Sequence, residues 1–155
     1  MSQISLHSPV GDITLFEADG AIVAVEWGWV PDQEETALLA EARRQLEAYF
    51  SGDLMAFSLP LNPAGGTAFQ RRVWQAMRSI PYGHTRTYGD VAADLGTSAR
   101  AVGGACGKNP LPILIPCHRI VGGNGALGGY TGSEGVDTKK RLLLLEGAAL
   151  PQPAA

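Results

Sequence analysis

Short apolar runs separated by turn residues open the chain. Residues 13–17 and 21–27 have strand character and flank the pair Asp19-Gly20, which strongly favours a tight β-hairpin turn. Residues 4–7 supply a further short strand. The pattern predicts a small antiparallel sheet.

Helical spacing of apolar residues follows, from about Glu34 until Gly52 ends it. A stretch rich in proline, asparagine and glycine at 60–66 is typical of a linker. We therefore expect two domains, a scaffold of sheet and helix at 1–63 and a second domain at 64–155.

The second domain is predicted to be helical. Thr67 and Gln70 form a capping-box pattern ahead of an amphipathic helix. A short helix capped by Thr87 ends at Gly96, and a Thr-Ser pair then caps another helix at 99–106. Two short helices joined by a glycine-containing turn indicate a helix-turn-helix.

The second of these short helices has an almost bare surface. Gly103 and Gly104 each cost about 1 kcal/mol relative to alanine inside a helix, and Ala99 and Ala101 are also small. Arg100 is the one long side chain of the first turn. Such a helix suits backbone contact in a narrow DNA groove better than the recognition of base edges. Close helix packing inside the protein is an equally good explanation of the small residues.

Charge is distributed unevenly along the chain. Residues 1–66 carry two basic and ten acidic side chains, whereas residues 67–125 carry seven basic and two acidic ones. A basic working surface on an acidic scaffold fits phosphate contacts, although ordinary solvated charge gives the same counts. Neither a long apolar run nor a signal-peptide pattern occurs, so we expect no membrane association and a cytoplasmic protein.

Only two cysteines are present, Cys106 and Cys117, which favours a reducing compartment over a disulfide framework. Together with His118 they match no paired zinc-ligand spacing, and we expect no metal and no cofactor. The apolar run 113–116 predicts a buried strand that ends at a proline.

The segment Cys117-His118-Arg119 follows that run directly. Cationic neighbours lower the pKa of a thiol from its usual value of about 8.5, and the thiolate is the nucleophile. The sequence therefore predicts a nucleophilic Cys117, although an isolated cysteine is more often a small buried apolar residue.

A larger set of motifs points to one family. The segments are Gly66 to Gln70, Val73-Trp74, Ile80 to Gly83, Thr85 to Gly89, Ala99 to Gly103, Asn109-Pro110, Pro116 to Arg119, Gly128 to Tyr130 and Leu142 to Gly147. In these segments, which span more than half of the chain, the sequence resembles the O6-alkylguanine-DNA alkyltransferases, which repair DNA by direct reversal. The first 60 residues match that family only in pattern.

The resemblance implies an α+β fold, with a ribonuclease H-like N-terminal sheet and helix and a C-terminal helical domain that carries a helix-turn-helix and the active-site cysteine. It implies a monomer that binds double-stranded DNA through the minor groove and flips the damaged nucleotide. The alkyl group of O6-alkylguanine, and of O4-alkylthymine, would pass irreversibly to the cysteine.

The family pattern also implies residue roles. Cys117 would be the alkyl acceptor, and His118, linked to Glu146 through a water, would be the base that forms the thiolate. Asn109 would tie the recognition helix to the active-site segment. Tyr88 would press on a phosphate and protonate the departing guanine.

Arg100 would enter the duplex and fill the space left by the flipped base. The other residues implied in DNA binding are Tyr88, Ala99, Ala101, Gly103 and Arg119. The residues implied in the guanine pocket are Pro112, Gly128, Tyr130 and Thr131.

Some features depart from the family pattern. His84 stands where Glu or Gln is frequent, the turn before Ala99 is shorter than usual, and no N-terminal zinc cluster can be assembled. Two other functions stay open: a cysteine hydrolase, and an alkyltransferase-like module that binds the lesion without transfer. The histidine adjacent to Cys117 is unlike papain-type hydrolases, and the presence of the cysteine itself opposes a binding-only module.

Overall fold

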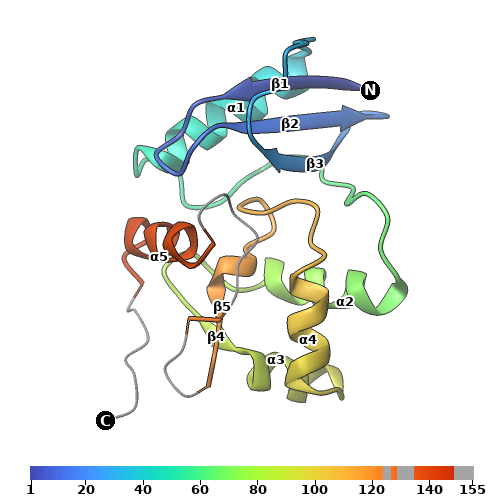
Figure 1. Cartoon of the computed structure of the whole chain (residues 1–155), viewed down its shortest axis with the longest axis vertical. Coiled ribbons are helices and arrows are strands. Elements are labelled where there is room, and N and C mark those ends of the chain that lie inside the picture. The colour runs from blue at the N-terminus through green and yellow to red at the C-terminus, as the bar shows by residue number, and fades with distance from the viewer. Residues whose placement is uncertain (124–126, 129–134, 149–155) are drawn as a thin grey trace.

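Three strands and one helix form the N-terminal part of the protein (Figure 1). The computed structural model describes residues 1–123, 127–128 and 135–148. The antiparallel sheet has the order β1-β2-β3, and α1 packs against it. The bounds of these elements are β1 Ser2–Leu6, β2 Ile13–Ala18, β3 Ala21–Trp27 and α1 Ala37–Phe50.

The predicted hairpin between β2 and β3 is confirmed. Asp19 and Gly20 both have positive φ, at 50° and 78°, as the favoured two-residue hairpin turn requires. The helix begins at Ala37, later than the expected start near Glu34, because Thr36 is its N-cap and accepts a hydrogen bond from the amide of Leu39.

The segment at 60–66, expected to be a linker, is bonded to the edge of the sheet. Ile22 donates to the carbonyl of Pro60, and Asn62 donates back to the carbonyl of Ile22, both at 2.9 Å. Further along β3, Val25 donates to the carbonyl of Pro110 at 2.8 Å. The edge strand is therefore covered by the segment at 60–66 and by the segment at Pro110, and the second of these contacts ties the C-terminal part to the sheet.

Among its described residues, the C-terminal part has four α-helices: α2 Ala68–Arg78, α3 Tyr88–Leu95, α4 Ala99–Cys106 and α5 Val136–Leu145. The expected caps at Thr67, Thr87 and Ser98 are all present. Gly96 ends α3 in the left-handed conformation, and α4 then packs against α3 as the helix-turn-helix requires.

The prediction of a buried strand at 113–116 is wrong. These residues are buried, but they form a tight turn in which Ile113 has a φ of 73°. A β-branched residue in that region is strained. The turn is held by a hydrogen bond from the amide of Ile115 to the carbonyl of Leu111 at 2.8 Å. Apolar composition predicted the burial of this segment but not its backbone path.

A parallel pair of two-residue strands joins the helix-turn-helix to the segment after this turn. β4 (Arg86–Thr87) pairs with β5 (Ile120–Val121), and the short 3-10 helix η1 (Cys117–Arg119) immediately precedes β5.

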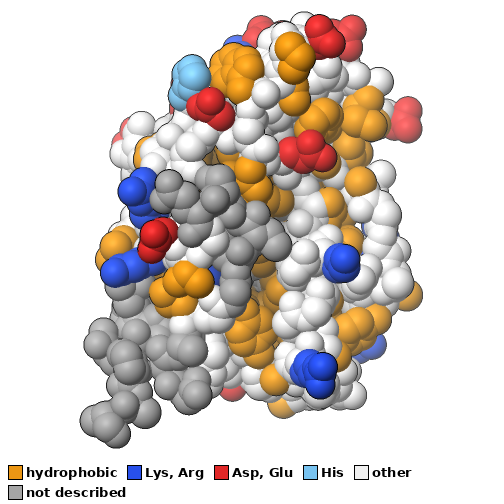
Figure 2. Space-filling model, viewed as in Figure 1, with side chains coloured by type: hydrophobic (Ala, Val, Ile, Leu, Met, Phe, Trp, Pro, Cys, Tyr) orange, Lys and Arg blue, Asp and Glu red, His pale blue; other side chains and the backbone are white. Residues whose placement is uncertain are grey.

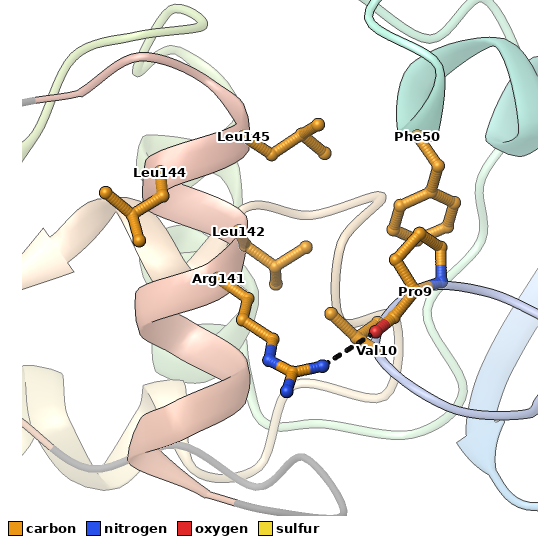
Figure 3. A pocket seen from close by; sticks show the side chains of 7 residues that line it. All are labelled: Pro9, Val10, Phe50, Arg141, Leu142, Leu144 and Leu145. Carbon is orange, nitrogen blue, oxygen red and sulfur yellow. Dashed lines mark hydrogen bonds between the residues drawn. The ribbon is translucent and has the colours of Figure 1, made fainter.

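α5 lies between the N-terminal part and the rest of the C-terminal part (Figure 1). Arg141 donates to the carbonyl of Pro9 at 3.0 Å across an apolar hollow of about 360 Å³ (Figure 3). One continuous cluster of buried apolar residues extends from the sheet into the helices. Within the described ranges, no helix is long and apolar enough to cross a membrane.

Candidate active site

The site is built around Cys117, whose side chain is only 6% exposed. Asn109 shapes the turn that leads to it: its side-chain oxygen accepts from the amide of Leu111, and its amide nitrogen donates to the carbonyl of Ile115, both at 2.9 Å. The amide of Cys117 donates to the same carbonyl of Ile115 at 2.8 Å. Asn109 thus connects the end of α4 to the start of η1.

Glu146, at the end of α5, is the centre of a buried polar network. One carboxylate oxygen, Oε2, accepts from Nε2 of His118 at 2.7 Å and from Nη2 of Arg119 at 3.0 Å. The other oxygen, Oε1, accepts from Nε of Arg119 at 2.8 Å and from the amide of Gly83 at 3.4 Å. Burial alone raises the pKa of the Glu146 carboxyl, but the hydrogen bonds from His118 and Arg119 outweigh it and lower the pKa to about 2. Glu146 is therefore an anion at neutral pH.

This network fixes the tautomer of His118. A carboxylate can only accept hydrogen bonds, so the hydrogen of a neutral imidazole lies on Nε2. Burial lowers the pKa of His118 although its bond to Glu146 opposes the shift, so the ring is neutral. Its Nδ1 is buried and has no hydrogen-bond partner among the described residues. An unprotonated ring nitrogen beside Cys117 in the chain is suited to accept a proton.

Two expectations about these residues are wrong. His118 contacts Glu146 directly and not through a water. Arg119, expected at the DNA, is buried, and besides its fork on Glu146 it donates to the carbonyl of Ile80 at 2.7 Å. A buried guanidinium needs such partners because an unpaired charge inside a protein is costly.

Tyr88 begins α3 directly after β4, which pairs with β5, and the electrostatic influence of Cys117 reaches its phenol. Burial, with smaller contributions from Cys106 and Cys117, raises the pKa of its phenol to about 12. The phenol therefore keeps its proton at neutral pH. Gly128 lies against it, because a Cβ there would stand 2.6 Å from the Tyr88 hydroxyl oxygen.

Lys139 of α5 is fully buried and donates to the Tyr88 hydroxyl oxygen at 3.4 Å. Burial lowers its pKa to about 8, against the electrostatic influence of Cys117 and Cys106, which raises it. Lys139 was missed in the sequence because one lysine in a Lys-Lys-Arg run gives no sign of burial. The spacing of Leu142 and Leu143, which mark the buried face of α5, could have pointed to it.

The start of α4 faces solvent. Ala99, Arg100 and Gly104 are exposed, whereas Ala101 and Gly103 are half-buried. Acidic side chains gather mainly over the N-terminal part in the view of Figure 2, away from the region of α4. His84 is exposed as well.

Of the residues implied for the guanine pocket, Pro112 is buried in the turn before Cys117 and Gly128 lies at Tyr88. Tyr130 and Thr131 lie outside the described residues. Cys106 is buried, and its thiol is 3.6 Å from the sulfur of Met77. Burial raises the pKa of Cys106 to about 12, so it is a poor nucleophile at neutral pH. No group of three or more possible metal ligands gathers within the described ranges.

A buried thiol, a carboxylate-bound histidine and a phenol in the same part of the chain as a helix-turn-helix are the groups expected of a DNA-binding protein that transfers a group to a cysteine. Two family models match the chain: the ribonuclease-like domain of 6-O-methylguanine DNA methyltransferase over residues 1–63 and the DNA-binding domain of the same protein over residues 68–148. The chain belongs to the 6-O-methylguanine DNA methyltransferase family.

The sequence is similar to those of known proteins over nearly the whole length of both chains. The methylated-DNA–protein-cysteine methyltransferase of Methanosarcina acetivorans is 44% identical, over 92% of this chain and 96% of the relative. The constitutive methylated-DNA–protein-cysteine methyltransferase of Bacillus subtilis is 43% identical, over 90% of this chain and 92% of the relative. The structure of Mycobacterium tuberculosis OGT in complex with DNA superposes with a TM-score of 0.85 at 38% identity and covers 97% of this chain and 96% of that one. The α+β fold is that of the family.

Proposed function

We propose that the protein repairs O6-methylguanine in DNA by transferring the methyl group irreversibly to Cys117. Family membership gives the reaction class, that of a methylated-DNA–protein-cysteine methyltransferase. The observation that carries the assignment of Cys117 is the neutral His118 beside it, with Nε2 bound to Glu146 and Nδ1 unbonded among the described residues.

The step is a displacement at carbon. Nδ1 of His118 takes the thiol proton, and the sulfur of Cys117 attacks the methyl carbon. The bond between that carbon and O6 breaks, its electron pair goes to guanine, and the phenol of Tyr88 supplies a proton to the base. The products are a thioether and unmodified guanine. Nothing in the step regenerates the thiol, so one protein repairs one lesion.

The same proposal covers DNA binding. Residues 1–63 serve as scaffold and residues 64–155 as the DNA-binding and acceptor domain, with one monomer bound in the minor groove. A base in a duplex must be flipped to reach a buried thiol, at a cost of a few kcal/mol. The exposed Arg100 at the start of α4 offsets this cost by entering the stack.

The glycines of α4 support this docking mode. A Cβ at Gly104 would meet nothing within 4 Å, and a Cβ at Gly103 would stand 3.8 Å from the Tyr88 ring, an ordinary contact. Packing within the protein therefore does not require glycine at either position, which leaves an external partner as the reason.

Other alkyl groups and O4-alkylthymine are further substrates in this proposal.

The test uses a duplex with one O6-methylguanine that carries a deuterated methyl group. We expect the labelled group on the protein in a single turnover, on the peptide that contains Cys117. Cys117→Ser should abolish transfer and keep binding to the lesion. Label on Cys106 would show that the wrong thiol is assigned. Binding without label would indicate a lesion-binding module, and hydrolysis of thioester or ester probes would indicate a hydrolase.

A further inference from the structure

The N-terminal part of the chain contributes one side chain to the Glu146 network. The hydroxyl of Tyr49, in α1, donates to Oε2 of Glu146 at 2.6 Å across 97 residues of sequence. The side chain of Tyr49 is only 1% exposed. The transfer step described above makes no use of it.

Aromatic neighbours fix the direction of this hydroxyl. The Tyr49 ring packs edge-on to Phe50 and Tyr82, with centroid distances of 5.3 and 6.2 Å, and lies 5.3 Å from the ring of Phe57. Of the four rings in this cluster, those of Tyr49, Phe50 and Phe57 come from the N-terminal part and only that of Tyr82 comes from the C-terminal part. Burial raises the pKa of Tyr49 and the charge of Glu146 raises it further, so the hydroxyl stays protonated and always donates.

Tyr49 is one of several donors to the Glu146 carboxylate. Arg119 binds both oxygens of Glu146 with its fork, and the amide of Gly83 adds a contact to Oε1. Tyr49 instead adds a donor to Oε2, the oxygen that His118 also uses. A hydrogen bond to a carboxylate stabilises the anion, so the carboxylate attracts the histidine proton less strongly.

We infer that Tyr49 is a positioning residue that acts through Glu146, limits the proton affinity of the His118–Glu146 pair, and so sets the pH at which Cys117 becomes reactive. The inference rests on the proposed function, in which Cys117 is the acceptor and His118 its base. The other charged groups that act on this pair are Arg119 from η1 and Lys139 from α5, and both oppose protonation of His118.

Tyr49→Phe removes one oxygen atom and keeps the aromatic packing. Tyr82→Phe is the matched control, because its hydroxyl donates to the carbonyl of Leu145 and not to Glu146. The rate of Cys117 alkylation by the isolated base O6-benzylguanine, measured against pH, reports on the thiol without any DNA contact. Thermal melting of each variant checks the fold.

In Tyr49→Phe the imidazolium gains stabilisation from the less neutralised carboxylate. We expect the midpoint of the rate profile to move to lower pH by about half a unit, a change of about threefold in proton affinity. Tyr82→Phe should keep the wild-type midpoint. In a Glu146→Gln background Tyr49→Phe should cause no shift, because residues that act through one group are not additive.

An unchanged midpoint in Tyr49→Phe, an equal shift in Tyr82→Phe, or a shift that persists in the Glu146→Gln background would each overturn the inference. A uniform loss of rate at every pH would assign Tyr49 a purely structural role and overturn it as well. Failure of the proposed function is distinguishable, because wild-type protein would then gain no benzyl group on Cys117.

Discussion

Gly104 offers a substitution for which stability and function should change in opposite directions. It lies in the interior of α4, is exposed, and a Cβ there would meet nothing within 4 Å. Its replacement by alanine adds helix propensity without a clash, so Gly104→Ala should stabilise the fold by about 0.5–1 kcal/mol. For a chain of this length that corresponds to a rise in the melting temperature of roughly 1–4 °C.

Repair of duplex DNA should respond differently if the bare surface of α4 meets the DNA backbone. A methyl group on that surface holds the backbone away from the helix. We expect transfer from duplex O6-methylguanine to slow by about tenfold, equivalent to about 1.4 kcal/mol. The reaction with isolated O6-benzylguanine, which needs no docking, should keep its wild-type rate.

The assay compares rates on the two substrates at one salt concentration, because phosphate contacts depend strongly on salt. Ala93→Gly, at an exposed position of α3, is the control: it changes helix propensity by the same amount with the opposite sign and leaves α4 intact. If Gly104→Ala is more stable and repairs duplex DNA at the wild-type rate, the surface at residue 104 does not approach DNA and the docking argument is wrong.

Three further predictions follow from the site. Arg100→Ala should slow transfer on duplex DNA but not on the isolated base; an equal loss on both would mean that Arg100 supports the fold or the pocket. The folded-state pKa of Glu146 is about 2, below the unfolded value of about 4.3, so its ionisation stabilises the fold above about pH 5, and this contribution is lost as the pH falls to about 2. Urea unfolding at both ends of that pH range measures how much the free energy of unfolding falls in acid. This decrease should be smaller in Glu146→Gln than in the wild type, and an equal decrease would contradict the assigned pKa of Glu146. Lys139 has a folded-state pKa of about 8 against about 10.4 when unfolded, so the unfolded chain binds more protons between these values and stability should rise with pH there. Lys139→Met should remove that rise, and its persistence in the variant would place the titration elsewhere.

The elements predicted best are those that depend on neighbouring residues. The hairpin at Asp19 and Gly20 and the caps at Thr67, Thr87 and Ser98 were predicted correctly, because each involves hydrogen bonds or dihedral preferences within about four residues. The identity of the site was also accessible from sequence, because the Pro-Cys-His-Arg motif and the helix-turn-helix are continuous segments.

The destinations of side chains were predicted less well. From the sequence, Arg119 is expected to be a surface cation in a basic stretch. In the structure it is buried and pairs with the carboxylate of Glu146, 27 residues away. Tyr49 looked like one more apolar position of an amphipathic helix, and nothing near it in sequence indicates that its hydroxyl reaches Glu146. Lys139 is not singled out by the sequence, because other charged residues surround it.

The sequence by itself determined the hairpin, the helix caps and the family, and it indicated Cys117 as the candidate nucleophile, because hydrogen-bond caps, turn dihedrals and short motifs are encoded within a few consecutive residues. Only the tertiary structure decided the backbone path at 113–116 and the network on Glu146. An apolar run requires burial but permits a strand or a turn, and here the side chain of Asn109 selects the turn. A buried carboxylate requires donors, and which donors reach it depends on how α1, η1 and α5 pack together.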